Sequence, residues 1–124
     1  MKSKRPVNLD ITTIKLPLPA YTSILHRVSG VLLFIGFGVL LYGLEMSLDS
    51  EASFNALKDT MISPLVKFPV WIVLSALIYH FVAGVKHLLM DVDIGDGKAS
   101  GKTGAVLTII ISTVLILSAG VWLW

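Results

Sequence analysis

The chain has 124 residues, of which 55% are hydrophobic and 15% charged, and its mean hydropathy is +0.83. A chain this apolar is not an ordinary soluble domain, and its apolar runs leave no room for a separate one. The absence of cysteine excludes disulfides, thiolate chemistry and cysteine-ligated iron–sulfur clusters within the chain. The formal net charge of +2 says little about partners, and we expect no nucleic acid among them.

The first 21 residues are mixed in character and are predicted to form a cytoplasmic N-terminal segment. Basic residues at the start are separated by about twenty residues from the first long apolar run, unlike those of a cleaved signal peptide. Pro17 and Pro19 disfavour helix in this stretch, so the first helix is expected to begin after them. Thr22 or Ser23 is then the natural N-cap.

Three uncharged runs approach the about 20 residues that a helix needs to cross a bilayer; they are 28–44, 68–85 and 103–124. With their flanks they predict transmembrane helices at 22–48, 64–90 and 103–123. We therefore expect an all-α membrane protein with three transmembrane helices, folded as a single membrane-anchor domain over 1–124 within a multi-subunit helical bundle. The connections are expected to be an outer loop with room for one helical turn at 54–58, and a glycine-rich inner loop.

Lysine and arginine are distributed unevenly across this predicted membrane. Only Lys58 and Lys67 lie on one side, whereas the other eight lie on the opposite side: Lys2, Lys4, Arg5, Lys15, Arg27, Lys86, Lys98 and Lys102. The positive-inside rule therefore places the N-terminus and the inner loop in the cytoplasm. The three tryptophans then fall at the outer interface, as an aromatic belt does.

The first predicted helix opens with the sequence Ser-Ile-Leu-His-Arg-Val-Ser-Gly at 23–30. Ser23 and Arg27 share one helical face, and His26 and Gly30 share the neighbouring face. Because Arg27 cannot lose its charge, it requires an anion or a strong acceptor near the headgroup level. The propionates of a haem or a quinone carbonyl would satisfy it. The plain alternative is a snorkelling arginine that anchors the helix end.

His80 is the most informative residue, because it lies deep inside an uncharged run. An ionisable group at that depth is costly and usually faces a cavity, a cofactor or a partner. Small residues share its helical face, namely Ala76, Ala83 and Gly84. We expect that face to accept a flat, bulky group, for which haem is the first candidate. The alternative is a buried histidine that is hydrogen-bonded across helices.

A low-spin haem b takes two axial ligands, and this chain offers one deep histidine. The second ligand is therefore expected from another membrane chain or a second copy of this one. His87 lies two turns from His80, roughly 10 Å along the axis, so the two cannot ligate one iron from opposite faces. A macrocycle centred on His80 would bring its propionates toward Arg27, His26 and His87. Asp91 is a candidate for proton uptake, although it and His87 can also be read as a plain interfacial flank.

Small and hydroxyl residues on the outer helices of the predicted bundle favour close helix contacts in lipid. We expect such contacts at Gly36, Gly43, Ala105, Thr108, Ser112 and Ala119.

Three segments carry a resemblance to a known family: 5–10 (RPVNLD), 23–30 (SILHRVSG), and 79–91 with its Tyr-His, Lys-His and final Asp. On these motifs the chain resembles the larger hydrophobic subunit of bacterial succinate dehydrogenase (respiratory complex II), a cytochrome b-type membrane anchor. The likeness covers nearly the whole chain.

The resemblance implies specific roles. His80 matches the axial ligand of haem b, with the other histidine on the smaller anchor subunit. Ser23 and Arg27 match ubiquinone-site residues, and Ile24 lies beside them. Arg27 and His26 also match positions near the haem propionates, and His87 stays a candidate for haem binding from its place on the helix. The implied partners are the second hydrophobic subunit, an iron–sulfur subunit, a flavoprotein subunit and the lipid bilayer of the bacterial inner membrane. Succinate chemistry is not expected in this chain itself.

Two other functions fit the sequence less well. One is a haem-free, structural or quinone-binding anchor of a fumarate reductase-like complex, against which His80 argues. The other is a proton-relay subunit, which would need a chain of polar groups across the bilayer. The second predicted span offers little beyond Ser75 on the outer side of His80.

Overall fold

The computed structural model describes residues 7–124, and the regular structure in this range is entirely helical. The elements are α1 (Leu18–Asp49), α2 (Glu51–Ile62), α3 (Pro64–Asp91) and α4 (Lys98–Leu123). Helices α1, α3 and α4 are each long and apolar enough to cross a membrane. The expectation of an all-α membrane protein with three spans is therefore confirmed. Lys2, Lys4 and Arg5, on which the predicted orientation partly rests, lie outside the described residues, as do the first two positions of the 5–10 motif.

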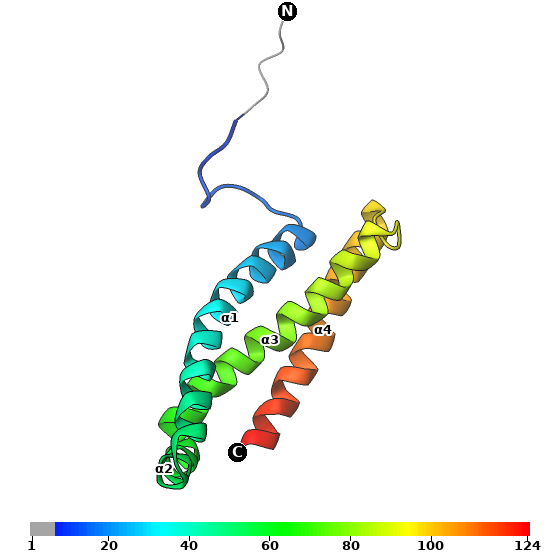
Figure 1. Ribbon diagram of the computed structural model, residues 1–124. Coiled ribbons are helices and arrows are strands. Elements are labelled where there is room, and N and C mark those ends of the chain that lie inside the picture. Colours follow the sequence, from blue (N-terminus) through cyan, green and yellow to red (C-terminus); the bar gives the residue numbers. More distant parts are fainter. Residues whose placement is uncertain (1–6) are drawn as a thin grey trace, which may run out of the picture.

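The three long helices pack side by side, with α3 in contact with both α1 and α4 (Figure 1). The N-terminal segment and the α3–α4 connection lie at one end of the bundle. Helix α2 and the C-terminus lie at the other end, as three successive crossings require. The bundle thus has one end that carries the segment before α1 and the end of α3, where the candidate site residues cluster.

Helix α1 begins at Leu18, so the prediction that it begins only after Pro19 is wrong. Pro17 is the N-cap, and Pro19 lies in the first turn, where a missing N–H costs nothing because that donor has no intrahelical acceptor. Thr22 is therefore not a cap. Its hydroxyl donates to the carbonyl of Pro19 at 2.9 Å, inside the helix, and its side chain is buried.

The predicted outer loop is instead the 12-residue helix α2. Ser50 caps it, because its hydroxyl oxygen accepts the backbone N–H of Ser53 at 3.1 Å. Glu51 in the first turn complements the helix dipole. Pro64 then starts α3 at its first position. The capping residues of α2 can be recognised in the sequence. A search for uninterrupted apolar runs, however, does not detect a short polar helix.

Helix α3 ends in a Schellman motif. The N–H of Ile94 donates to the carbonyl of Leu89 at 2.9 Å, and that of Asp93 donates to the carbonyl of Met90 at 3.1 Å. Asp93 has φ 61°, a left-handed conformation that aspartate tolerates better than most residues. Because this turn is compact, α4 starts at Lys98, earlier than the predicted residue 103.

The interior of the bundle consists of small residues, and its exterior consists of large apolar ones. The buried positions in the described range include Gly36, Ala76, Ala83, Ala105, Thr108 and Ser112. Phe34 is 83% exposed and Phe81 is 69% exposed. A surface of this kind is stable only against lipid or other membrane helices. The predicted helix contact at Gly43 is wrong within the described part of this chain, since a Cβ added there would meet nothing within 4 Å.

Candidate functional site

The segment 23–30 divides between two faces of α1. His26, Ser29 and Gly30 lie against α3, as their contacts with His80 show. Ile24 and Arg27 are exposed on the outside of the chain. A step of one residue turns an α-helix by about 100°, so neighbours in this segment serve different surfaces.

His80 is anchored to α1 through one ring nitrogen. Its Nδ1 lies 3.0 Å from the backbone carbonyl oxygen of His26 and 3.0 Å from the hydroxyl oxygen of Ser29. A carbonyl oxygen can only accept a hydrogen bond, so Nδ1 carries the proton. The neutral ring then has its lone pair on Nε2, the tautomer in which Nε2 can bind a metal.

The second ring nitrogen of His80 is Nε2. Within residues 7–124 it has no hydrogen-bond partner. The buried polar side-chain atom that lacks a partner in this range is the hydroxyl of Ser112, not Nε2. His80 as a whole is half-buried, and its Nε2 is not among the fully buried atoms that lack a partner, so this nitrogen keeps some exposed surface. The arrangement engages one imidazole nitrogen and leaves the other without a hydrogen-bond partner among the described residues.

The other two histidines gather around this ring. His26 stacks on His80, with ring centroids 4.1 Å apart and an interplanar angle of 12°. His26 also contacts His87, whose centroid lies 5.0 Å away at 51°. Residues 7–124 nevertheless contain no group of three histidine or carboxylate side chains placed to hold a metal ion together.

The sequence favoured a haem beside His80 because small residues share its helical face, and this part of the argument is wrong. Ala76 and Ala83 are buried inside the bundle, so they do not leave an open face above and below the ring. Gly84 faces His26, whose Nε2 would lie 3.6 Å from an added Cβ. These small residues let the helices approach each other closely.

The polar side chains predicted for the quinone site make no hydrogen bond among residues 7–124. Ser23 is half-buried and Arg27 is exposed, and neither side chain has a hydrogen bond or an ion pair within the described range. Asp91, at the end of α3, is exposed as well. The guanidinium and the hydroxyl are thus available to a ligand or partner on the outer face of α1.

Sequence reasoning missed the polar contacts that tie α3 to the start of α1. The hydroxyl of Tyr79 donates to the carbonyl of Thr22 at 2.8 Å. The ammonium of Lys86 reaches the hydroxyl of Thr22 at 3.4 Å. Ser29, the partner of His80, was missed too, although its place three residues after His26 was a signal. These contacts join residues more than fifty positions apart.

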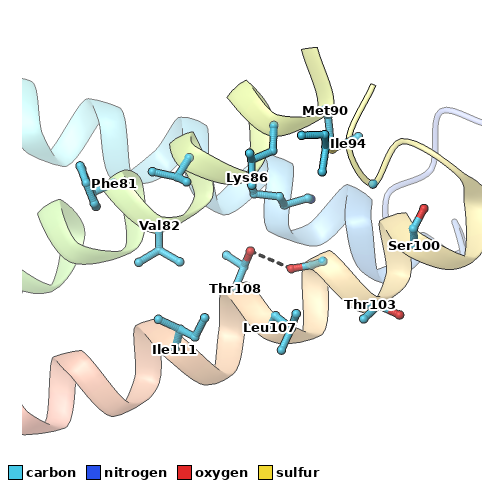
Figure 2. Close-up of a pocket in the computed structure, with 14 residues that line it drawn as sticks. Phe81, Val82, Lys86, Met90, Ile94, Ser100, Thr103, Leu107, Thr108 and Ile111 are labelled. Atoms are coloured by element: carbon cyan, nitrogen blue, oxygen red, sulfur yellow. Dashed lines mark hydrogen bonds between the residues drawn. The ribbon is translucent and has the colours of Figure 1, made fainter. Parts of the chain in front are cut away.

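The larger of the two described cavities lies away from the histidines. It measures about 570 Å³, lies between α3 and α4, and is lined mainly by apolar side chains (Figure 2). Lys86 is its charged residue, and Thr103 and Thr108 contribute hydroxyls. The second cavity, of about 380 Å³, includes Ser29 and Tyr79 in its lining. Cavity size alone would therefore misplace the chemistry of this molecule.

Three apolar spans with a small-residue interior and large apolar side chains on the exterior define a membrane subunit that packs against lipid or other membrane helices. Comparison with known proteins agrees. Residues 1–119 match the family model described as succinate dehydrogenase/fumarate reductase transmembrane subunit. The chain belongs to this family, and it is therefore a membrane-anchor subunit of that enzyme complex.

Individual relatives support this assignment. The succinate dehydrogenase cytochrome b556 subunit of Coxiella burnetii is 38% identical over 125 residues, which span the whole of both chains. The cytochrome b556 subunit of Paracoccus denitrificans is 32% identical over 98 residues, covering 76% of this chain and 72% of that one. The mitochondrial cytochrome b560 subunit of Mus musculus is 32% identical over 120 residues, covering 89% and 69% respectively. The resemblance to a bacterial-type anchor is confirmed.

Proposed function

We propose that this chain binds haem b together with a second hydrophobic subunit and forms part of the ubiquinone reduction site of a succinate dehydrogenase. The observation that supports the proposal most directly is the geometry of His80. Its Nδ1 proton is held by the carbonyl of His26, while its Nε2 is free and accessible. Metal-ligating histidines commonly show this arrangement, because the hydrogen bond at one nitrogen orients the other.

The residues present fit a haem at this position. His80 would hold the haem iron through Nε2, and the second hydrophobic subunit would supply a further ligand. His26, Arg27 and His87 would lie near the propionates, since they surround or follow the His80 contact at the same end of the bundle. When bound, haem b would serve as a one-electron carrier. The chain contributes a fixed ligand and nearby cationic or hydrogen-bonding groups.

The partners follow from the surfaces of the spans. The large apolar side chains on the outside of α1 and α3 require lipid or further membrane helices, which fits a second anchor subunit. An iron–sulfur subunit and a flavoprotein subunit would bind at the end that carries the N-terminal segment. With basic residues at that end, the positive-inside rule makes it cytoplasmic in the bacterial inner membrane.

For quinone, we propose Ser23, Ile24 and Arg27 on the outer face of α1. Reduction of a quinone to a quinol takes two electrons and two protons. Hydrogen-bond donors act strongly on developing negative charge where the dielectric is low. The Ser23 hydroxyl would donate to a quinone carbonyl, Arg27 would stabilise charge beside it, and Ile24, 43% exposed, would contact the ring. Asp91, exposed at the end of α3, would take part in proton uptake.

Two variants test these roles in the purified complex. His80→Ala should lower haem content by pyridine haemochrome assay, because it removes the axial nitrogen. A wild-type complex without haem would leave the chain as a haem-free anchor. Arg27→Leu should cut quinone reductase activity strongly, while succinate oxidation by an artificial acceptor survives. Lys98→Leu, which removes an exposed charge at the same end of the bundle, is the matched control. Equal loss of both activities in Arg27→Leu would contradict the quinone role.

A further inference from the structure

We infer that Ser29 is a positioning residue for His80. Together with the backbone carbonyl of His26, its hydroxyl holds the imidazole in one orientation and in the tautomer that keeps the proton on Nδ1 and the lone pair on Nε2. This inference rests on the proposed role of His80 as haem ligand. It assigns a function to a residue that touches neither haem nor quinone in the proposed sites.

Three polar atoms form a closed triangle at the contact between α1 and α3. The Ser29 hydroxyl donates its single proton to the carbonyl oxygen of His26 at 2.7 Å. Its lone pairs are then free to face Nδ1 of His80, 3.0 Å away. Nδ1 also lies 3.0 Å from the same carbonyl oxygen. The Nδ1 proton is therefore shared between two acceptors, and each polar atom of the triangle is satisfied.

The opposite tautomer would break this arrangement. With a bare Nδ1, the Ser29 hydroxyl would have to turn and donate to the ring. The carbonyl of His26 would then lose the hydroxyl and face a second lone pair at 3.0 Å. Because Ser29 is only 5% exposed, little water could compensate. In an interior of low dielectric, two lone pairs facing each other at this distance are costly, so the Nδ1–H tautomer is selected by the chain itself.

The ring is also prevented from turning. His26 covers one face of it at a centroid separation of 4.1 Å. Gly30 lies against its edge, where an added Cβ would come within 3.1 Å of Cε1 and 3.6 Å of Nδ1. Ordinary carbon contacts are about 3.5–4.0 Å, so a side chain at position 30 would push the imidazole out of the triangle. Ser29 and Gly30 thus act on the same ring from adjacent positions.

A hydrogen bond at Nδ1 raises the basicity of the ligand nitrogen across the ring. A more basic ligand favours the ferric over the ferrous state of an iron that it binds. Removing the Ser29 hydroxyl leaves only the carbonyl as acceptor and so weakens this effect. We expect about a tenfold fall in the ratio of ferric to ferrous affinity, at the low end of the effects known for such outer partners. For one electron this ratio corresponds to a rise of about 59 mV in midpoint potential.

The experiment compares Ser29→Ala, Ser29→Thr and Ser75→Ala in the assembled complex. Ser75 is the matched control, because its hydroxyl also bonds back to a carbonyl, that of Trp71 at 2.6 Å, but reaches no histidine. Redox titration of the haem band gives the potential, and the g values of the ferric haem in electron paramagnetic resonance report the orientation of the axial imidazole. We expect a raised potential and altered g values in Ser29→Ala, recovery in Ser29→Thr, and wild-type values in Ser75→Ala.

The possible outcomes distinguish a failure of the positioning role of Ser29 from a failure of the haem role of His80. If Ser29→Ala retains the wild-type potential and g values, the positioning role is refuted while the haem role of His80 stands. If the wild-type complex lacks haem, or His80→Ala keeps the full haem spectrum, the proposed function fails and this inference fails with it. If Ser29→Ala does not assemble, Ser29→Cys decides, because the thiol keeps the size but is a weaker hydrogen-bonding group. It should raise the potential, and an unchanged potential in that variant would refute the inference.

Discussion

Gly36→Ala should destabilise the contact between α1 and α3. A Cβ at position 36 would lie 2.7 Å from Cγ1 and 3.0 Å from Cγ2 of Val73 on α3. Carbon atoms normally approach to about 3.5–4.0 Å, so the overlap with the nearer methyl is about 1 Å. Valine in a helix has essentially one favourable χ1 rotamer. Because both methyl groups face Gly36, rotation gives little relief and the helices must separate.

The size of the effect follows from two opposing terms. Overpacking of a well-packed contact costs about 1–3 kcal/mol. Replacing glycine by alanine inside a helix returns about 1 kcal/mol of helix propensity. Since two methyl groups clash at once, the overpacking cost should fall in the upper half of its range. We expect a net loss of roughly 1–2 kcal/mol in the free energy of unfolding.

Unfolding of the purified complex in mixed detergent micelles, followed by circular dichroism, measures this loss. Gly38→Ala is the matched control, because an added Cβ there meets nothing within 4 Å and only helix propensity changes. Adding Val73→Ala to the Gly36→Ala variant removes the clashing methyls and should recover stability, as a coupling between neighbouring sites. If Gly36→Ala is as stable as Gly38→Ala, or if Val73→Ala gives no recovery, the described contact between these helices is incorrect.

Three further predictions concern single hydrogen bonds. Trp71→Phe should cost about 0.6–1.7 kcal/mol in the same unfolding assay, because the indole N–H donates to a backbone carbonyl of α4 at 3.0 Å; Trp122→Phe, at a side chain 81% exposed, should cost nothing measurable. Tyr79→Phe should cost a similar amount, since its hydroxyl ties α3 to the N-terminal part of α1 at 2.8 Å; equal stability would contradict that bond. Hydrogen bonds from the Thr12 hydroxyl and N–H lower the pKa of Asp10. The turn that they form should therefore be intact above the ordinary pKa of aspartate and lost as the pH falls through the lowered pKa. The Thr12 amide resonance measures this change, and in Asp10→Asn it should be independent of pH.

The three membrane spans were predictable because the bilayer dictates composition locally. A helix that crosses the bilayer must be apolar along its whole length, so charge and hydropathy averaged over a sliding window identify such a helix. The start of α1 and the whole of α2 obey other rules. Pro19 is tolerated in a first turn, and Ser50 caps a short polar helix, but both facts depend on where a helix begins rather than on its average composition. Hydropathy does not contain that information.

His80 could be singled out from sequence, whereas the reason for its place could not. Depth in the membrane marked it as unusual, but its neighbours Ala76 and Ala83 proved to be packing residues rather than walls of an open face. The contacts that define its chemistry come from Ser29 and His26, 51 and 54 positions away. Which side of α1 meets α3 depends on the crossing of two helices, and helical periodicity within one segment cannot supply it.

The division of the 23–30 segment between two faces of α1 makes the two proposed sites separable by experiment. Arg27 makes no side-chain bond within the described range and points outward, so its replacement should leave the triangle of Ser29, His26 and His80 intact. Ser29 is buried on the face of α1 that packs against α3, so its replacement leaves the outward face of α1 unchanged. A haem potential that moves with Ser29 but not with Arg27, together with a quinone reductase activity that moves with Arg27, would therefore assign one role to each face. If both variants shifted both quantities alike, the helix would be responding as a whole, and neither residue could be given a local function.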